Sequence, residues 1–290
     1  MQRMRKHISK NKYISKVPAC LILIGLILWT FLPIYNMIVT SFKTWDDIWI
    51  TTYLPPKPTL EAYLAVLTQS YFRVEKFWLW MLNSLRIALE TMALSLLVGL
   101  LAGYAISNKS KISLRARSCV ANVSLLSYIF PASLLSIPLF ALMMYYKLLN
   151  TDWAVSLSLT ALVSPFNTWM AAEYFNSIPR EIEEAAEIDG ASAFKRFRMI
   201  LLPLITPAIV ALSVWSFLYS WNNYLYPLLM ISDENRFLLP IAMGFFLSTD
   251  DSPWNIFMAV GIIYAIPPLI LYYMFKRYIV SGLFRGAVKY

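Results

Sequence analysis

Six long stretches of the chain contain no Asp, Glu, Lys or Arg and are apolar along most of their length. They cover residues 17–42, 91–108, 118–146, 153–172, 199–232 and 252–275. A helix needs roughly 20 mostly apolar residues to cross the hydrocarbon of a bilayer. The pattern therefore predicts an all-α polytopic membrane protein with about six transmembrane helices.

Two further details refine this pattern. A seventh apolar run, 237–249, is too short to span and contains Pro240 and Gly244, so we expect a loop or interfacial segment there. The first run, 17–42, is longer than the apolar core of a signal peptide and no small-residue cleavage pattern follows it. We predict that it is retained as the first span.

The composition excludes a soluble protein. Hydrophobic residues make up 59% of the 290 residues and charged residues only 14%, whereas a soluble domain carries roughly 25% charged residues. The formal net charge of +9 suits either nucleic acid or a membrane surface. The positions of the basic residues decide between the two.

The basic residues cluster on one side of the predicted spans. Six lie in 1–16, and four lie in each of 109–117, 180–198 and 276–289. Because cytoplasmic loops carry an excess of Lys and Arg, both termini are predicted to be cytoplasmic. This topology accounts for most of the positive charge, and no nucleic-acid partner is expected.

The predicted orientation divides the chain into five parts. These are a basic cytoplasmic N-terminal tail (1–16), the first transmembrane helix (17–42), an extracytoplasmic segment (43–81), a five-helix core (82–276) with a cytoplasmic loop at 177–203, and a cytoplasmic C-terminal tail (277–290). The extracytoplasmic segment is expected to form a small ordered cap, since it is rich in aromatic residues.

The second predicted span, which we expect to begin near Leu82, carries two notable pairs. Arg86 and Glu90 are four residues apart and share one helix face, either as a structural ion pair or as the lining of a polar pathway. Gly99 and Gly103 form a GxxxG pattern, which allows another helix to approach closely in lipid.

The fifth predicted span carries a stretch rich in aromatic and amide side chains. Sugars have apolar ring faces and hydroxyl edges, which such side chains suit. An outer aromatic belt combined with helix packing explains the stretch equally well. The candidate residues of a substrate pathway are Trp215, Tyr219, Trp221, Asn222 and Asn223.

Catalytic and metal-binding chemistry is scarce in this sequence. The one histidine, His7, lies in the basic tail, and no GxxxxGK[ST] phosphate loop is present. We therefore predict no catalytic residue, metal site, cofactor or enzyme activity. An ion-coupled secondary transporter is an alternative, but the spans offer only Glu90 and, at a boundary, Glu173 for ion coupling. Energy supplied by a partner fits better.

The loop between the fourth and fifth predicted spans is the most informative segment. Pro179 suits the first turn of a helix, Gly190 suits its end, and Ser192 can cap a second short helix. Interfacial helices favour Lys and Arg with bulky apolar residues, whereas this one is acidic and contains alanines. The pattern indicates a helix–turn–helix that fits a socket on another protein.

This loop resembles the "EAA" signature of bacterial ATP-binding-cassette (ABC) importer permeases. Glu184, Ala185 and Ala186 are followed at the signature spacing by Gly190, Ile200 and Leu202 with Pro203. Other stretches resemble the carbohydrate, maltose-type branch: NSLRIAL (83–89), LLAGYAIS (100–107), LLNT (148–151), WNN (221–223) and GLFRGAVKY (282–290). The resemblance runs from about residue 80 to the end.

The resemblance implies a type I ABC importer permease fold in a bacterial inner membrane. It implies a sugar or oligosaccharide substrate, an ABC ATPase dimer, a second homologous permease chain in a heterodimer, and an extracytoplasmic solute-binding protein that touches outer loops including 233–253. The residues implied to contact the ATPase are Glu184, Ala185, Ala186, Asp189, Gly190, Ile200 and Pro203, joined by Gly286, Val288 and Lys289 of the tail. Tyr290 departs from the glycine that often ends such chains.

Overall fold

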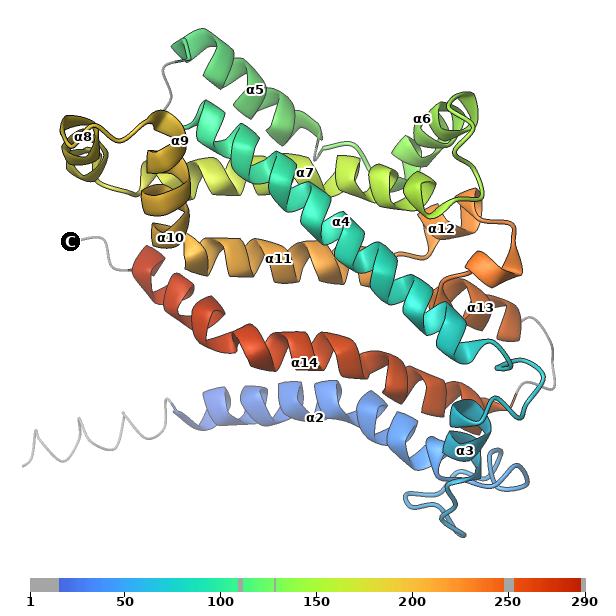
Figure 1. Cartoon of the computed structure of the whole chain (residues 1–290). Helices are drawn as coiled ribbons and strands as arrows, with labels where there is room; N and C mark the ends of the chain where they lie inside the picture. The colour runs from blue at the N-terminus through green and yellow to red at the C-terminus, as the bar shows by residue number, and fades with distance from the viewer. Residues whose placement is uncertain (1–15, 109–111, 128, 248–252, 288–290) are drawn as a thin grey trace, which may run out of the picture. The chain divides into compact units, whose positions relative to one another are not determined.

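The computed structural model describes residues 16–287 apart from 109–111, 128 and 248–252. Every regular element in these ranges is a helix, which agrees with the all-α prediction (Figure 1). The chain divides into two compact units, residues 1–75 with 249–264 and residues 76–248 with 265–290.

The first unit holds α2 (Lys16–Ser41), α3 (Glu61–Leu67) and the first residues of α14 (Trp254–Ala287). At the end of α2 the hydroxyl groups of Ser41 and Tyr63 lie 2.8 Å apart. The side-chain amide of Asn255 donates to the backbone carbonyl of Lys43 over 3.1 Å. The segment that follows α2 is therefore folded back and ordered.

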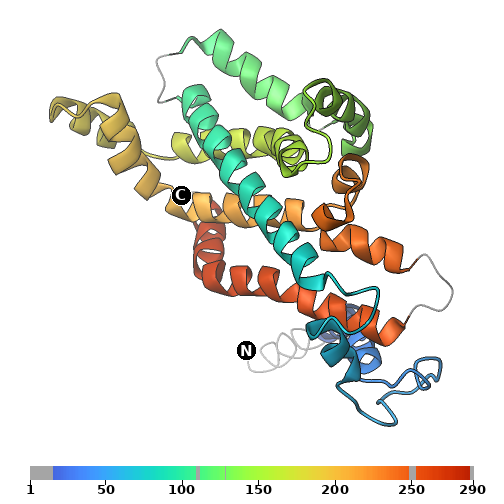
Figure 2. The ribbon, with the colours of Figure 1, turned by 45° about the vertical axis from the view of Figure 1, so that its right-hand side comes forward.

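Besides the part of α14 that follows residue 264, the second unit contains the remaining helices. They are α4 (Phe77–Ile106), α5 (Leu114–Ser127), α6 (Ala132–Tyr145), α7 (Asp152–Asn176), α8 (Arg180–Ile188), α9 (Ala193–Arg196), the π-helix η1 (Phe197–Leu201), α10 (Leu202–Leu204), α11 (Thr206–Trp221), α12 (Leu225–Met230), the 3₁₀-helix η2 (Glu234–Arg236) and α13 (Leu239–Phe246). α4 crosses both α7 and α11 (Figures 1 and 2). α8 to α10 lie at one end of these helices, and α12 and α13 lie at the other.

The GxxxG pair of α4 marks its closest approach to α7. A β-carbon built on Gly99 would lie 2.5 Å from the Cβ of Asn167, and one on Gly103 would lie 2.6 Å from the Cβ of Ala171. No side chain fits at such distances without moving a helix. The predicted packing role of this pair is confirmed.

Small polar side chains connect these packed helices. The amide of Asn167 in α7 donates to Ser216 Oγ in α11 over 2.9 Å, and Ser220 Oγ in α11 lies 3.3 Å from Thr91 Oγ1 in α4. The hydrocarbon of a bilayer offers no hydrogen-bond partner, so polar groups within spans pair with one another. The core of this unit is therefore held by polar contacts as well as by packing.

Within the described part of the chain, three helices are long and apolar enough to cross a membrane: Pro18–Ser41, Phe77–Ile106 and Trp254–Tyr278. The pair Ala193–Leu204 and Thr206–Trp221 adds a fourth if it counts as one bent span. α7 has 25 residues, but its buried serine, threonine and asparagine side chains lower its hydropathy. Continuous apolar helices are thus fewer than the six spans expected from the sequence.

Two of the predicted spans are not continuous helices, which corrects the sequence prediction. Run 118–146 divides into α5 and α6 because Pro131, which has no backbone N–H, stands at the N-cap of α6 with extended backbone. Within run 199–232 the helix bends by 77° between α10 and α11. It is interrupted again between the end of α11 at Trp221 and the start of α12 at Leu225. Pro207 lies in the first turn of α11, where a missing N–H is tolerated.

Two boundaries also differ from expectation. α4 begins at Phe77, earlier than the start expected near Leu82. The short run 237–249 contains α13, which has 8 residues and buries Ile241 and Phe246. The backbone N–H of Leu239 donates to Ser84 Oγ of α4 over 2.9 Å. Leu239–Phe246 is therefore a packed helix and not a loop, and an interfacial position for it stays a prediction.

Candidate functional site

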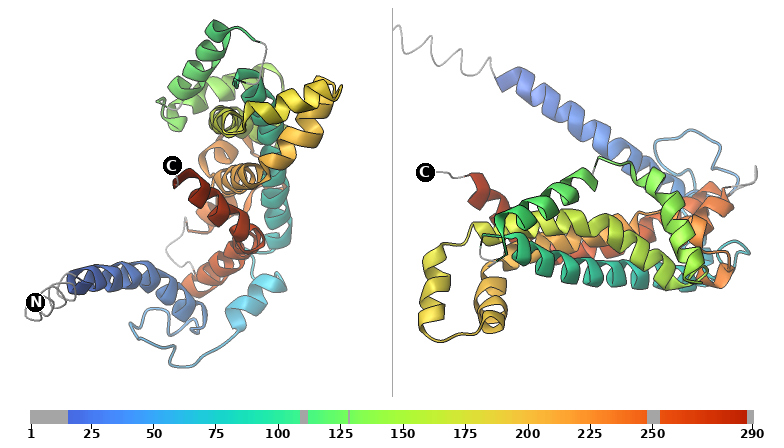
Figure 3. Two further views of the ribbon diagram at one scale, coloured as in Figure 1. Left: turned by 90° about the vertical axis from the view of Figure 1, so that its left-hand side faces the viewer. Right: turned by 90° about the horizontal axis from the view of Figure 1, so that it is seen from above.

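The loop between α7 and α11 folds as a helical hairpin, formed by α8, a turn and α9, that extends beyond the helix core. The right-hand view of Figure 3 shows it reaching away from the ends of α4 and α7. Pro179 precedes α8 as its N-cap, and Glu181 and Glu183 lie in the first turn. Acidic groups there interact favourably with the positive end of the helix dipole. The predicted helix–turn–helix is confirmed.

Gly190 ends α8 in a Schellman motif. Its N–H donates to the carbonyl of Glu187, and the N–H of Ala191 donates to that of Ala186, both over 3.0 Å. The φ angle of Gly190 is +79°, in the left-handed region that other residues rarely adopt. Glycine is thus required here by the backbone, since a β-carbon would meet no atom within 4 Å.

The second half of the hairpin joins the core through an irregular helix. Ser192 Oγ accepts from the N–H of Lys195 over 3.3 Å and caps α9. The π-helix η1 follows, with Ile200 half-buried in it, and the exposed Pro203 lies in α10 just before the 77° bend into α11. Motion of the hairpin would therefore reach α11 through a kinked connection.

Arg196 of α9 closes the inner face of the hairpin. Its Nη1 donates to the carbonyl of Ala191 over 3.0 Å and lies 3.7 Å from Glu187 Oε1, while its Nε lies 3.8 Å from Glu183 Oε1. The residue is only 8% exposed. Sequence analysis missed this contact, because the partners lie on opposite sides of the turn and share no helical spacing.

An aromatic cluster seats the hairpin on the core. The centroid of the Tyr104 ring in α4 lies 5.5 Å from the centroid of the Phe175 ring in α7 and 5.1 Å from that of the Phe197 ring in η1. The Tyr104 hydroxyl also lies 3.5 Å from Glu183 Oε1. Leu201 and other buried apolar residues surround this cluster. The base of the hairpin thus contacts the ends of two long helices.

The outer face of the hairpin is exposed. Of the signature residues, Glu184, Ala185, Asp189 and Gly190 are exposed, while Ala186 packs inward. Two large apolar side chains that the sequence analysis did not single out, Ile188 and Phe194, are 87% and 70% exposed. Their position in an otherwise polar loop is the signal that could have identified them. Exposed large apolar groups on a polar loop are typical of a binding surface.

The C-terminal residues implied to contact the ATPase lie at or beyond the end of α14. Gly286 falls in the last turn of α14, and Val288 and Lys289 lie outside the described residues.

The five candidate pathway residues fall into two environments. Trp215 is 39% exposed, and its ring lies 5.3 Å from that of Phe166 and 6.1 Å from that of Tyr219. Trp221 is buried and stacks on Phe217. The structure thus places Trp215 and Tyr219 in a partly exposed aromatic group and Trp221 in the core.

The two asparagines that follow Trp221 have local roles. Asn222 is exposed and its amide donates to the carbonyl of Leu218 over 3.0 Å. Asn223 Oδ1 accepts from the N–H of Tyr226 over 3.1 Å and so caps the start of α12.

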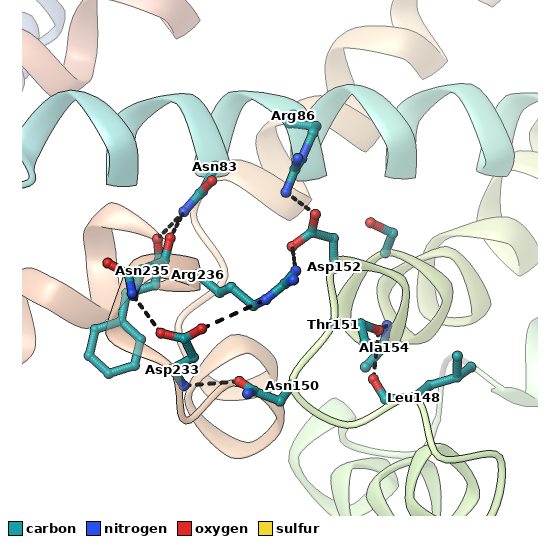
Figure 4. A network of polar contacts seen from close by, with 12 residues as sticks. Asn83, Arg86, Leu148, Asn150, Thr151, Asp152, Ala154, Asp233, Asn235 and Arg236 are labelled. Atoms are coloured by element: carbon teal, nitrogen blue, oxygen red, sulfur yellow. Dashed lines mark hydrogen bonds and ion pairs between the residues drawn. The ribbon is translucent and has the colours of Figure 1, made fainter.

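A polar network lies at the end of the unit opposite the hairpin (Figure 4). Asp152, the first residue of α7, pairs with Arg86 of α4 and lies 3.5 Å from Arg236 of η2. Arg86 also lies 3.9 Å from Glu90, which accepts from Ser156 Oγ over 2.6 Å. The predicted Arg86–Glu90 pair is present as part of this larger network.

The segment that carries η2 is held on α4 by further hydrogen bonds. The indole of Trp80 donates to the carbonyl of Glu234 over 2.9 Å. The amide of Asn83 donates to the carbonyls of Asn235 and Phe237 over 3.0 and 3.1 Å. The two ends of the unit therefore differ: one carries an exposed hairpin, and the other is held together by ion pairs and hydrogen bonds.

These features define the class of protein: a multi-pass helical membrane protein with a folded hairpin at one end that exposes large apolar side chains. Residues 95–285 match the family described as "binding-protein-dependent transport system inner membrane component". The chain belongs to this family, in the carbohydrate branch of ABC importer permeases. Members of the family are transport subunits and not enzymes themselves, and their transport depends on a solute-binding protein.

Individual relatives agree with this assignment. The chain is 31% identical over 261 residues to the arabinooligosaccharides transport system permease protein AraQ of Halalkalibacterium halodurans, covering 89% of this chain and 90% of the relative. It is 31% identical over 273 residues to the trehalose/maltose transport system permease protein MalG of Thermococcus litoralis, covering 93% and 96%.

A solved structure shows the same fold. A chain of a bacterial ABC transporter involved in the import of the acidic polysaccharide alginate superposes with a TM-score of 0.80 at 21% identity, covering 93% of this chain and 98% of that one. The ABC importer permease fold is therefore established over nearly the whole chain.

Proposed function

We propose that this chain is the transmembrane subunit of an ABC importer that moves a sugar or oligosaccharide into the cell, powered by a separate ATPase subunit that docks on the α8–α9 hairpin. The observation that carries this proposal is the hairpin itself. It is rigidly capped at Gly190 and Ser192, seated on the helix core, and exposes Ile188 and Phe194 on its outer face. An exposed apolar pair beside acidic residues fits a protein cleft.

The docking surface can be tested by co-purification with the ATPase subunit. Replacing Ile188 and Phe194 together with serine should release the ATPase from the purified complex and abolish uptake. The control is Leu114→Ser, because Leu114 at the start of α5 is exposed to the same 70% as Phe194. Full retention of the ATPase by the double variant would contradict docking at this face.

The substrate class rests on the named relatives. Arabinooligosaccharides and trehalose or maltose are the cargoes in the names of the two relatives described above. The partly exposed aromatic group of Phe166, Trp215 and Tyr219 offers ring faces on which a sugar can stack. We propose this group as part of the pathway, with the exposed Asn222 near it in sequence. Calorimetry of the cognate solute-binding protein against a panel of oligosaccharides would identify the cargo.

We propose six membrane passes with both termini in the cytoplasm. Three passes are the continuous apolar helices α2, α4 and α14. The other three are α5 together with α6, the single helix α7, and the bent segment from α9 to α11. Cysteine accessibility from each side of sealed vesicles tests this topology. Labelling of a cysteine at Ser192 from outside the cell would exclude it.

The assembly that follows pairs this chain with a second homologous permease chain, an ATPase dimer and an extracytoplasmic binding protein in a bacterial inner membrane. Reconstitution in proteoliposomes separates this proposal from an ion-coupled transporter. Uptake should require ATP and the ATPase subunits. Uptake driven by an ion gradient without any ATPase would favour the alternative.

A further inference from the structure

Arg196 is an unusual residue for the inside of a hairpin. It is one of two cations that the described residues bury, together with Lys43 in the first unit. An arginine away from water requires compensating partners, and removing one partner of a buried ion pair is strongly destabilising. Because little water reaches Arg196, protein groups must stabilise its charge.

The partners of Arg196 lie on three parts of the hairpin. Its guanidinium reaches the carboxylates of Glu183 and Glu187 in α8 and the carbonyl of Ala191 in the turn, while its own backbone belongs to α9. The side chain of Glu183 is only 12% exposed. The Schellman bonds order Gly190 and Ala191 relative to α8, and the Arg196 side chain connects α9 to α8.

The same contact continues into the helix core. Glu183 Oε1 lies 3.5 Å from the hydroxyl of Tyr104, which belongs to α4, the helix that crosses both α7 and α11 (Figure 1). Phe197, the residue after Arg196, packs on the Tyr104 ring. A continuous set of contacts thus runs from Arg196 of α9 through Glu183 of α8 to Tyr104 at the end of α4.

We propose that Arg196 is a positioning residue for coupling: it fixes α8 to α9 and to α4, so that movement of the docked ATPase displaces the membrane helices instead of bending the hairpin. This inference rests on the proposed function. Without the guanidinium, α8 and α9 lose the ion pairs with Glu183 and Glu187 and the hydrogen bond to Ala191, so the hairpin can hinge more easily at its turn. ATP hydrolysis would then proceed with less transport for each ATP.

The test uses the complete complex, with ATPase subunits, second permease chain and binding protein, in proteoliposomes. The variants are Arg196→Met, Arg196→Lys and Glu183→Gln, and the control is Arg115→Met, which removes an exposed cation from α5. The probe is the radiolabelled oligosaccharide that the cognate solute-binding protein binds most tightly in calorimetry. The readout is the amount of this sugar taken up per ATP hydrolysed, because this ratio does not depend on how much complex is recovered.

We expect Arg196→Met and Glu183→Gln each to lower the uptake-to-ATP ratio at least about fivefold, the lower end of typical coupling factors between linked sites. Combining Arg196→Met with Glu183→Gln should lower the ratio by less than the product of the two single effects, because the two side chains share one ion pair. Arg196→Lys should lie between methionine and wild type, and Arg115→Met should match wild type.

Several results would overturn the inference. One is an uptake-to-ATP ratio in Arg196→Met equal to that of the wild type. Another is a ratio in Arg196→Lys no higher than that in Arg196→Met. If Arg196→Met fails to assemble, Glu183→Gln decides the matter, since it preserves side-chain shape and a wild-type ratio there excludes the ion pair from coupling. Failure of the proposed function is seen separately, as a wild-type chain that binds no ATPase or transports without ATP.

Discussion

A β-carbon on Gly99 of α4 would lie 2.5 Å from the Cβ of Asn167 of α7. This approach brings the backbones of the two helices together and places Asn167 beside Ser216 of α11, to which it donates a hydrogen bond. One missing side chain thus permits both the close helix packing and a buried polar contact.

Replacing Gly99 with alanine should therefore destabilise the protein, although alanine is the better helix former. Overpacking of a dense core typically costs about 1–3 kcal/mol. The measurement is thermal unfolding of the purified protein in detergent. The control is Gly25→Ala in α2, where a β-carbon meets no atom within 4 Å and stability should be unchanged or higher. Equal effects of the two substitutions would contradict the packing role.

The conformation of Gly190 predicts a different pattern of substitution. A β-carbon there has open space, so the φ angle of +79° alone limits the residue. A left-handed conformation costs roughly 1–2 kcal/mol for most L-residues but less for asparagine. Gly190→Val should reduce uptake and ATPase retention, and Gly190→Asn should keep most of both. If valine and asparagine behave alike, the backbone requirement is refuted.

Asp152 is the centre of the polar network opposite the hairpin, because two arginines converge on its carboxylate. Its side chain is only 15% exposed. Asp152→Asn removes the charge and should lower stability by about 1.5–3 kcal/mol, the range for hydrogen bonds to charged groups. Thermal unfolding measures this, with the exposed Asp46→Asn as control. A neutral Asp152→Asn would show that the network contributes little.

The two candidate pathway tryptophans should respond differently to truncation. Trp221 is buried and stacked on Phe217, so Trp221→Ala should cost about 3–5 kcal/mol of stability. Trp215 is partly exposed, so Trp215→Ala should leave folding intact and reduce the rate of sugar uptake. Uptake and thermal unfolding measured together on both variants separate the roles. Normal uptake in Trp215→Ala would remove it from the pathway.

The sequence by itself determined the features that depend on local physics. Hydropathy runs indicated a helical membrane protein. Gly190 and Ser192 could be recognised as caps, because a cap bonds to residues only a few positions away. The GxxxG spacing of Gly99 and Gly103 indicated a close helix contact but not that α7 makes it. The "EAA" pattern identified the family before any fold was known.

Tertiary structure decided what depends on residues far apart in the chain. The burial of Trp221 against Phe217 follows from how the helices pack, which a hydropathy pattern does not record. Arg196 shows the limit most clearly. Its pairing with Glu183 crosses a turn. Glu183 of α8 in turn lies 3.5 Å from the hydroxyl of Tyr104 in α4, and α5, α6 and α7 separate these two helices along the chain. Only the folded chain brings these charges together, since no local period relates them.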